Sequence, residues 1–113
     1  MSNKKKIYLA GHKGMVGSAI YKKLKIDGYN NILVRSRSEL NLLDQNRTFR
    51  FLKKNKPHFV ILAAARVGGI KANLKNKDKF IYENLQIQNN IIHGSYLAGV
   101  KNLFLLGSSC IYP

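Results

Sequence analysis

Three glycines, each separated by two residues, form the stretch of this chain with the clearest chemical potential. Gly11, Gly14 and Gly17 lie between an expected strand, residues 5–10, that ends in an apolar run, and a segment whose apolar residues recur at helical spacing. Glycines in such a turn let the chain leave a strand sharply, let a phosphate approach the backbone and let a helix pack closely on the sheet. The first turn of the helix also offers unpaired N–H groups and its positive dipole end. The pattern therefore favours binding of a dinucleotide pyrophosphate over a purely structural turn.

Two arginines follow the second apolar segment, residues 32–34, where the sequence reads Arg35-Ser36-Arg37-Ser38. Dinucleotide folds that prefer NAD usually place an acid here to hold the ribose hydroxyls, whereas a 2′-phosphate needs positive charge. A guanidinium can hold phosphate oxygens in a bidentate manner. The alternative is a pair of solvated loop arginines, but together with the glycines the pattern favours NADP over NAD.

The elements that must position these residues alternate between short apolar strands and amphipathic helices. We expect an α/β fold with a Rossmann-type parallel sheet, joined by right-handed crossovers in strand order 3-2-1-4. The fourth strand is apolar throughout, as expected of a central strand covered on both faces. In this order the glycine turn lies beside Ser108, across the switch point between the first and fourth strands. The expected strands are 5–10, 32–34, 58–63 and 102–106, and the expected helices are 14–27, 45–55 with Asp44 as N-cap, and 78–99.

Composition limits the remaining possibilities. The chain has 113 residues, of which 45% are hydrophobic, and this predicts one globular domain or part of one. No apolar run reaches the length of a membrane span, and Cys110 is the only cysteine, so a reducing, cytoplasmic setting is expected. The net charge of +15 raises nucleic-acid binding as a hypothesis, but the lysines are scattered over several segments without a recognisable binding motif. No second histidine or cysteine stands at metal-binding spacing from His58, so no metal is expected.

Two further features have a functional and a structural interpretation. The small residues of 63–70 could let a cofactor lie against the carboxyl edge of the sheet, or they could form an ordinary flexible loop. Asn84 and Gln88 interrupt the apolar stripe of the last helix, and a buried amide needs hydrogen-bond partners. Each amide could be a structural anchor for a neighbouring loop or part of the site, and we favour the anchor.

Four segments together closely resemble the GDP-L-fucose synthases, a family of extended short-chain dehydrogenases/reductases. The glycine segment and the last segment are specific to that family rather than to Rossmann folds at large. The four segments are Gly11-His12-Lys13-Gly14-Met15-Val16-Gly17, Glu39-Leu40-Asn41-Leu42-Leu43-Asp44, Ala63-Ala64-Ala65-Arg66-Val67-Gly68-Gly69-Ile70 and Leu105-Leu106-Gly107-Ser108-Ser109-Cys110-Ile111-Tyr112-Pro113.

The resemblance implies an NADP-dependent enzyme that converts GDP-4-keto-6-deoxy-D-mannose to GDP-L-fucose by epimerising the carbons beside the ketone and then reducing it. Ser108 would hydrogen-bond the keto oxygen, and Cys110 would exchange protons at the epimerised carbons. A buried structural thiol is the alternative for Cys110. The implied cofactor-binding residues are Gly11, His12, Lys13, Gly14, Met15, Val16 and Gly17 for the pyrophosphate, Arg37, Ser38, Glu39, Leu40, Asn41 and Leu42 for the adenosine end, Ala63, Ala64 and Ala65 at the sheet edge, and Leu106, Gly107, Ser108 and Ser109 on the nicotinamide side.

Part of the family's machinery is missing from this sequence. The family's Tyr-x-x-x-Lys pair, catalytic histidine and substrate domain would lie beyond Pro113. Tyr21 and Lys25 have the right spacing, but they fall on the first helix, away from the nicotinamide, so we assign them no catalytic role. We therefore expect residues 1–113 to be the N-terminal part of an NADP-binding Rossmann domain, truncated after strand 4, without the substrate domain and inactive alone.

For a complete enzyme the resemblance implies a GDP-sugar substrate and a homodimer, without nucleic-acid or membrane partners. Two other functions stay open. One is a non-catalytic dinucleotide-binding or sensing module, and the other is a basic nucleic-acid-binding protein built on the same scaffold.

Overall fold

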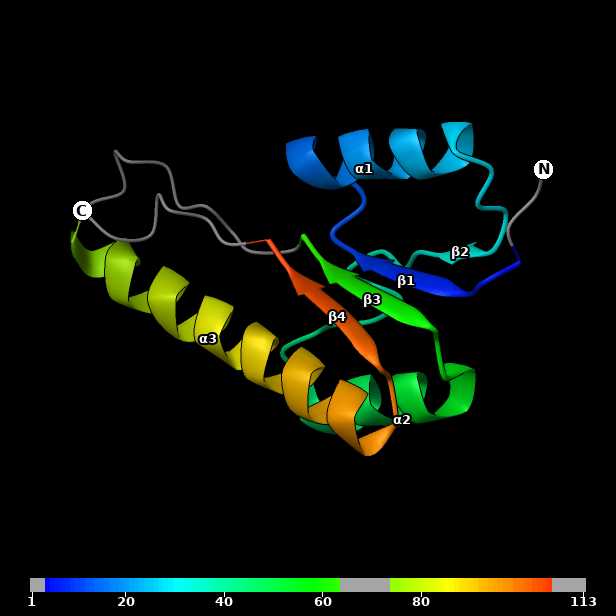
Figure 1. The fold of residues 1–113 in the computed structure, drawn as a ribbon. Coiled ribbons are helices and arrows are strands. Elements are labelled where there is room, and N and C mark those ends of the chain that lie inside the picture. Colours follow the sequence, from blue (N-terminus) through cyan, green and yellow to red (C-terminus); the bar gives the residue numbers. More distant parts are fainter. Residues whose placement is uncertain (1–3, 64–73, 107–113) are drawn as a thin grey trace.

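The structure is a computed structural model that describes residues 4–63 and 74–106. Within these ranges, strands and helices alternate along the chain as the hydrophobic pattern predicts, and every predicted element is present (Figure 1). The last helix begins at Leu74 rather than 78 and ends at Leu97 rather than 99. The elements are β1 (Ile7–Ala10), α1 (Met15–Ile26), β2 (Ile32–Leu33), α2 (Gln45–Asn55), β3 (Phe59–Leu62), α3 (Leu74–Leu97) and β4 (Asn102–Leu105).

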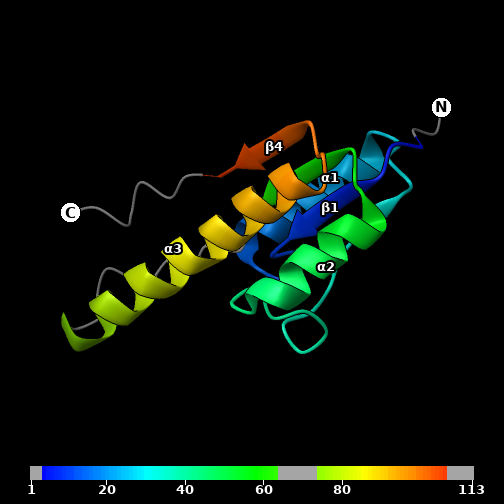
Figure 2. The ribbon, with the colours of Figure 1, turned by 90° about the horizontal axis from the view of Figure 1, so that it is seen from below.

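The four strands form one parallel sheet in the order β2-β1-β3-β4. β1 is buried along its whole length because it pairs with β2 on one side and β3 on the other. α1 covers one face of the sheet, while α2 and α3 lie side by side on the other face (Figures 1 and 2). The predicted Rossmann-type parallel α/β fold is confirmed.

The predicted strand order, 3-2-1-4, is wrong. The third strand pairs with β1 rather than extending the sheet beyond β2, with Ile7 opposite Phe59 and Ala10 opposite Leu62. The reason is the right-handedness of βαβ connections. Two such connections that run in opposite directions across a sheet place their helices on opposite faces of it. The chain moves from β1 outward to β2 with α1 on one face. Since α2 lies on the other face, its crossover has to return past β1.

β4 lies at the end of the described sheet, as the predicted order and the expected truncation after strand 4 both imply. It pairs with β3 alone and forms one edge of the described sheet. Phe104 and Leu105 are 51% and 43% exposed, so the apolar character of this strand does not reflect burial among the described residues. An apolar strand of this length is equally compatible with an edge and a central position, and the sequence pattern does not separate the two.

The core lies between the sheet and the α2–α3 pair. Tyr8, Leu52, Val60 and Ile91 belong to its buried cluster, and each is at most 1% exposed. Gly94 lets the two helices approach, since a Cβ there would lie 2.8 Å from a ring carbon of Phe49. In the described part of the chain, no helix combines the length and apolarity needed to cross a membrane.

Candidate functional site

The glycine turn leaves β1 and opens directly into α1. Gly11 has a φ of 91°, a conformation that favours glycine, and its carbonyl accepts a hydrogen bond of 3.2 Å from the N–H of Gly14. Gly14 is the N-cap of α1, and no side chain caps the helix. The first N–H groups of a helix have no partner within the helix itself. They are therefore available to an anion at the positive end of the helix dipole.

Gly14 and Gly17 differ in what they make possible. A Cβ on Gly17 would lie 1.8 Å from the carbonyl oxygen of Gly11, so this glycine allows the first turn of α1 to pack on the turn after β1. A Cβ on Gly14 would meet that same oxygen at 3.6 Å, an ordinary contact. Gly17 is thus required by the fold, whereas the space beside Gly14 is left open by the protein.

A cavity of about 200 Å³ lies beside this turn. Its walls come from three parts of the sequence: the end of β1 with the glycine turn, the segment after β2, and α3. Because parallel strands bring their carboxyl ends to one edge of the sheet, these parts meet where open α/β folds bind ligands. The lining residues are Tyr8, Gly11, His12, Lys13, Gly14, Arg35, Ser36, Arg37, Leu40, Asn41, Leu42, Leu43, Glu83 and Ile87.

The two arginines in the wall have different surroundings. Arg35 is half-buried, donates a hydrogen bond of 2.8 Å to the Val34 carbonyl and lies 5.2 Å over the centre of the Phe51 ring. Arg37 is exposed, and its guanidinium makes no hydrogen bond or ion pair with another of the residues that the structure describes. Arg35 is therefore held by the protein itself, and Arg37 is the arginine available to an anionic ligand.

A short turn presents Arg37 to the cavity. The Glu39 carboxylate accepts a hydrogen bond of 2.7 Å from the Ser36 N–H, and the Ser36 Oγ accepts one of 3.3 Å from the Glu39 N–H. This is the reciprocal pairing of a capping box. Hydrogen bonds from Ser36, with a smaller contribution from the positive charges of Arg35 and Lys13, lower the pKa of the Glu39 carboxyl. Glu39 consequently stabilises the turn.

Tyr8 forms part of the cavity wall from within the core. The residue is 1% exposed, and its ring centre lies 4.8 Å from that of Phe51. Burial raises the pKa of the Tyr8 hydroxyl, and the positive charge of Arg35 offsets only part of this effect. Tyr8 is therefore a neutral phenol at physiological pH.

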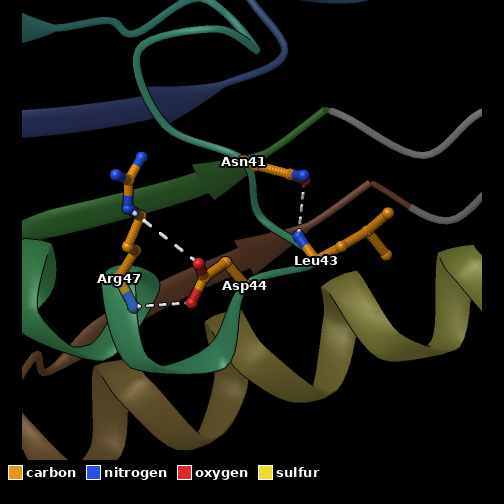
Figure 3. A network of polar contacts seen from close by, with 4 residues as sticks. All are labelled: Asn41, Leu43, Asp44 and Arg47. Carbon is orange, nitrogen blue, oxygen red and sulfur yellow. Dashed lines mark hydrogen bonds and ion pairs between the residues drawn. The ribbon is translucent and has the colours of Figure 1, made fainter.

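The segment between this turn and α2 is fixed by side-chain hydrogen bonds (Figure 3). The Asn41 Oδ1 accepts a hydrogen bond of 3.0 Å from the Leu43 N–H. The Asp44 carboxylate accepts one of 3.1 Å from the Arg47 N–H, which confirms the predicted N-cap of α2. From α3, the Asn90 Nδ2 donates a hydrogen bond of 2.7 Å to the Leu42 carbonyl. This segment of the cavity wall thus has defined positions although it belongs to no strand or helix.

The structure brings together many, but not all, of the residues expected at the site. Met15, Val16 and Gly17 lie on the first turn of α1, and Ser38 and Glu39 lie on the neighbouring turn, outside the cavity lining. Ala63 and Leu106 follow β3 and β4. Ala64, Ala65, Gly107, Ser108, Ser109 and Cys110 lie outside the described residues. The expected residues that line the cavity are Gly11, His12, Lys13, Gly14, Arg37, Leu40, Asn41 and Leu42.

Four lining residues were not predicted as site residues from the sequence: Tyr8, Leu43, Glu83 and Ile87. Tyr8 and Ile87 belong to apolar patterns that predict only burial. Glu83 is 9% exposed on α3, and an acid next to the apolar stripe of this helix was a signal that could have been noticed.

The corrected strand order also moves the expected switch point. β1 lies between β2 and β3. The connection from β1 leads to β2 on one side, and the connection from β3 leads to β4 on the other side and over the opposite face, so the switch point is the crevice between β1 and β3. The neighbour of the glycine turn across that crevice is therefore the end of β3, where the Ala63 N–H donates a hydrogen bond of 2.8 Å to the Ala10 carbonyl. β4 is one strand further away, about 4.8 Å more. Across residues 4–63 and 74–106, no group of three His, Cys, Asp or Glu side chains could hold a metal ion.

Comparison with known proteins gives consistent results. A sequence profile described as the NAD dependent epimerase/dehydratase family matches residues 7–113. A putative GDP-L-fucose synthase 2 from Arabidopsis thaliana is 55% identical over 108 residues, which cover 96% of this chain and 33% of that protein. The GDP-L-fucose synthase of Escherichia coli strain K12 is 47% identical over 98% of this chain and 35% of its own length. The resemblance noted in the sequence is therefore confirmed, and the chain spans about a third of the length of these relatives.

A solved structure extends the comparison to the fold. The GDP-mannoheptose C4 reductase of Campylobacter jejuni, solved with NADP bound, superimposes with a TM-score of 0.88 at 45% identity. The match covers 95% of this chain and 32% of the reductase.

Proposed function

The chain belongs to the NAD dependent epimerase/dehydratase family, and from that premise we propose that it forms the cofactor-binding part of an NADP-dependent epimerase/reductase of GDP-linked sugars. The observation that carries the proposal is the cavity itself. It joins an uncapped helix N-terminus and a glycine turn to a wall that contains Lys13 and Arg37. Amide donors and cations around one cavity are what a dinucleotide phosphate requires.

The pyrophosphate is assigned to the turn after β1. The N–H groups at the start of α1 have no side-chain cap, and the space beside Gly14 is open. Lys13 adds a positive charge to the same wall of the cavity. In this assignment the backbone binds and orients the cofactor, while Gly17 keeps the helix N-terminus against the sheet.

The 2′-phosphate is assigned to Arg37. Arg35 already donates to the Val34 carbonyl and packs over Phe51, so its guanidinium is only partly available. Arg37 lines the cavity and is exposed, which suits bidentate binding of a phosphate. Leu40 and Leu42 supply the apolar wall against which an adenine can lie.

Within this function we propose the reaction of the GDP-L-fucose synthases, on GDP-4-keto-6-deoxy-D-mannose. The support is the identity of 47–55% to relatives of that name and the match of the sequence around Ser108 and Cys110 to their motif. When bound, NADPH supplies the hydride for the ketone. Ser108 would donate a hydrogen bond to the keto oxygen, and Cys110 would exchange protons at the neighbouring carbons.

We expect residues 1–113 by themselves to bind the cofactor without reducing a keto sugar. The spacing Tyr-x-x-x-Lys occurs once in this sequence, at Tyr21 and Lys25. Both residues lie on α1, where the Lys25 Nζ lies 5.7 Å over the centre of the Tyr21 ring. The helix runs from its phosphate-binding end away from the cavity, so this pair is not positioned to protonate a substrate. A homodimer and a cytoplasmic location stay predictions.

Titration of the chain with NADPH and NADH, followed by calorimetry, tests the proposal. We expect tighter binding of NADPH. Arg37→Ala removes charge-assisted hydrogen bonds worth about 1.5–3 kcal/mol, so NADPH binding should weaken by at least about tenfold while NADH binding is unchanged. Arg50→Ala, which removes an exposed arginine of α2, is the matched control and should bind like the wild type. Equal affinity for the two cofactors, or no effect of Arg37→Ala, would refute the NADP assignment.

A further inference from the structure

The wall formed by residues 40–43 needs an external support. It lies between β2 and α2 and belongs to no strand or helix, so no ladder of backbone hydrogen bonds fixes its position. Its own turn, closed by Asn41 and the Leu43 N–H, sets the local shape. It does not set the distance of the wall from the rest of the cavity.

Leu40, Leu42 and Leu43 pack against the core, and Asn90 of α3 adds a directional contact that ties this segment to the helix. Asn90 is 2% exposed, and its Nδ2 donates a hydrogen bond of 2.7 Å to the Leu42 carbonyl, across 48 residues of sequence. The Asn90 Oδ1 accepts a hydrogen bond of 3.3 Å from the Gln86 Nε2, which determines which way the amide points. Both ends of the buried amide therefore have partners.

The same helix also supplies a wall of the cavity. Glu83 and Ile87 line it from α3, while Asn90 itself does not. Ile87 and Asn90 are three residues apart and lie on the same helix face. α3 thus contributes to the cavity in two ways, because Ile87 lines it and Asn90 holds the loop that contains the lining residues Leu40 and Leu42.

We propose that Asn90 is a positioning residue for the cofactor, which acts through the Leu42 carbonyl to hold the wall of residues 40–43 at binding distance from α3. This inference rests on the proposed function, because it assigns the adenosine end of NADP(H) to this cavity. Asn90 does not touch the cofactor. It determines where Leu40 and Leu42, which line the cavity, meet the adenosine.

Asn90→Asp tests the proposal because it keeps the shape of the side chain and replaces the amide donor with an oxygen. A carboxylate facing the Leu42 carbonyl cannot form the hydrogen bond and repels it. The probes are adenosine 2′,5′-bisphosphate, which needs the wall of residues 40–43, and inorganic pyrophosphate, which needs the glycine turn. We expect binding of the bisphosphate to weaken about tenfold and binding of pyrophosphate to stay unchanged.

Asn89→Asp is the matched control, since it adds the same charge at the neighbouring, exposed position of α3. It should bind both probes like the wild type. A second variant, Gln86→Leu, leaves Asn90 in place and removes the partner that orients it. This variant should weaken binding of the bisphosphate about two- to threefold, and it decides the question if Asn90→Asp does not fold.

The outcomes separate this proposal from the proposed function. A wild-type chain that does not bind adenosine 2′,5′-bisphosphate overturns both. A wild-type chain that binds it, together with an Asn90→Asp chain that binds it equally well, overturns the positioning role alone. The same conclusion follows if Asn90→Asp weakens both probes by the same factor, because that is the effect of a general loss of folded protein.

Discussion

Gly17→Ala and Gly14→Ala should have opposite consequences although the two glycines belong to one motif. The structure assigns Gly17 to the packing of α1 on the turn after β1, and it leaves the space beside Gly14 open. Gly17→Ala should therefore destabilise the fold. Gly14→Ala should leave the fold nearly intact and obstruct the phosphate.

The magnitude for Gly17 follows from its surroundings. An added Cβ would lie 1.8 Å from the Gly11 oxygen, 2.7 Å from the Gly11 carbonyl carbon and 3.1 Å from the His12 Cα. All three are backbone atoms, so relief requires movement of α1 or of the turn. Overpacking of this kind costs about 1–3 kcal/mol and occasionally more, against a gain of about 1 kcal/mol from the helix propensity of alanine. Because the obstructing atoms are backbone, we expect the upper end of this balance, a net loss of about 2 kcal/mol, or a decrease in melting temperature of about 10 °C.

Thermal unfolding followed by circular dichroism measures this effect. Gly94→Ala is the matched control, because it also adds a methyl group to a buried helical glycine. Its nearest contacts are side-chain atoms of Phe49 and Leu52, at 2.8 and 2.9 Å, and side chains can shift more easily than backbone. Its cost should therefore be the smaller of the two. A Gly17→Ala protein as stable as the wild type would refute the packing argument, and a Gly14→Ala protein that binds NADPH normally would refute the phosphate assignment.

Two further predictions concern the stability of the elements around the site. Lys56 ends α2 with a φ of 44°, a conformation that glycine adopts without strain. Lys56→Gly should therefore raise the free energy of unfolding, measured by urea titration, by about 1 kcal/mol. An unchanged free energy of unfolding, with the helix end intact, would contradict this prediction. The Glu39 carboxyl has a pKa below its usual value of 4.5, so its contribution to stability is present above that pH and is lost as the pH falls through the lower, folded-state value. The urea midpoint of Glu39→Gln should accordingly lie below that of the wild type at pH 7 and approach it at pH 3. If the two midpoints differ by the same amount at both pH values, Glu39 does not cap the turn through its charge.

Local patterns in the sequence were sufficient to predict the elements. The glycine spacing, the Asp44 cap and the periodicity of residues 45–55 depend on neighbours within a few residues, and the structure confirms them. The strand order depends on which face of the sheet receives α2, and no local pattern records that choice. The same holds for β4, whose apolar residues fit an edge and a centre equally well.

The site was predictable to a similar extent. Its phosphate-binding half rests on the glycines and arginines, which carry their own chemistry. The separate roles of Arg35 and Arg37 arise from a contact with Phe51, sixteen residues beyond Arg35, and could not be deduced from spacing. The role of Glu39 was readable, since Ser36 and Glu39 match a capping box.

The role of Asn90 could not be predicted from the sequence. α3 carries several amides in and beside its apolar stripe, and we singled out Asn84 and Gln88 as anchors. Asn84 is buried at 4% exposure and its anchor role stays a prediction, whereas Asn90, which we did not single out, donates the hydrogen bond to the loop before α2. Only the packing of α3 against that loop distinguishes one amide from the next.

The central claim is that backbone N–H groups at the start of α1 hold the pyrophosphate of the cofactor. Backbone amide NMR spectra of the ¹⁵N-labelled chain, recorded during titration with NADPH, test it most directly. We predict the largest shift changes at residues 12–16, with smaller changes at 36–42. Saturable binding that leaves the amides of residues 12–16 unchanged would contradict the account.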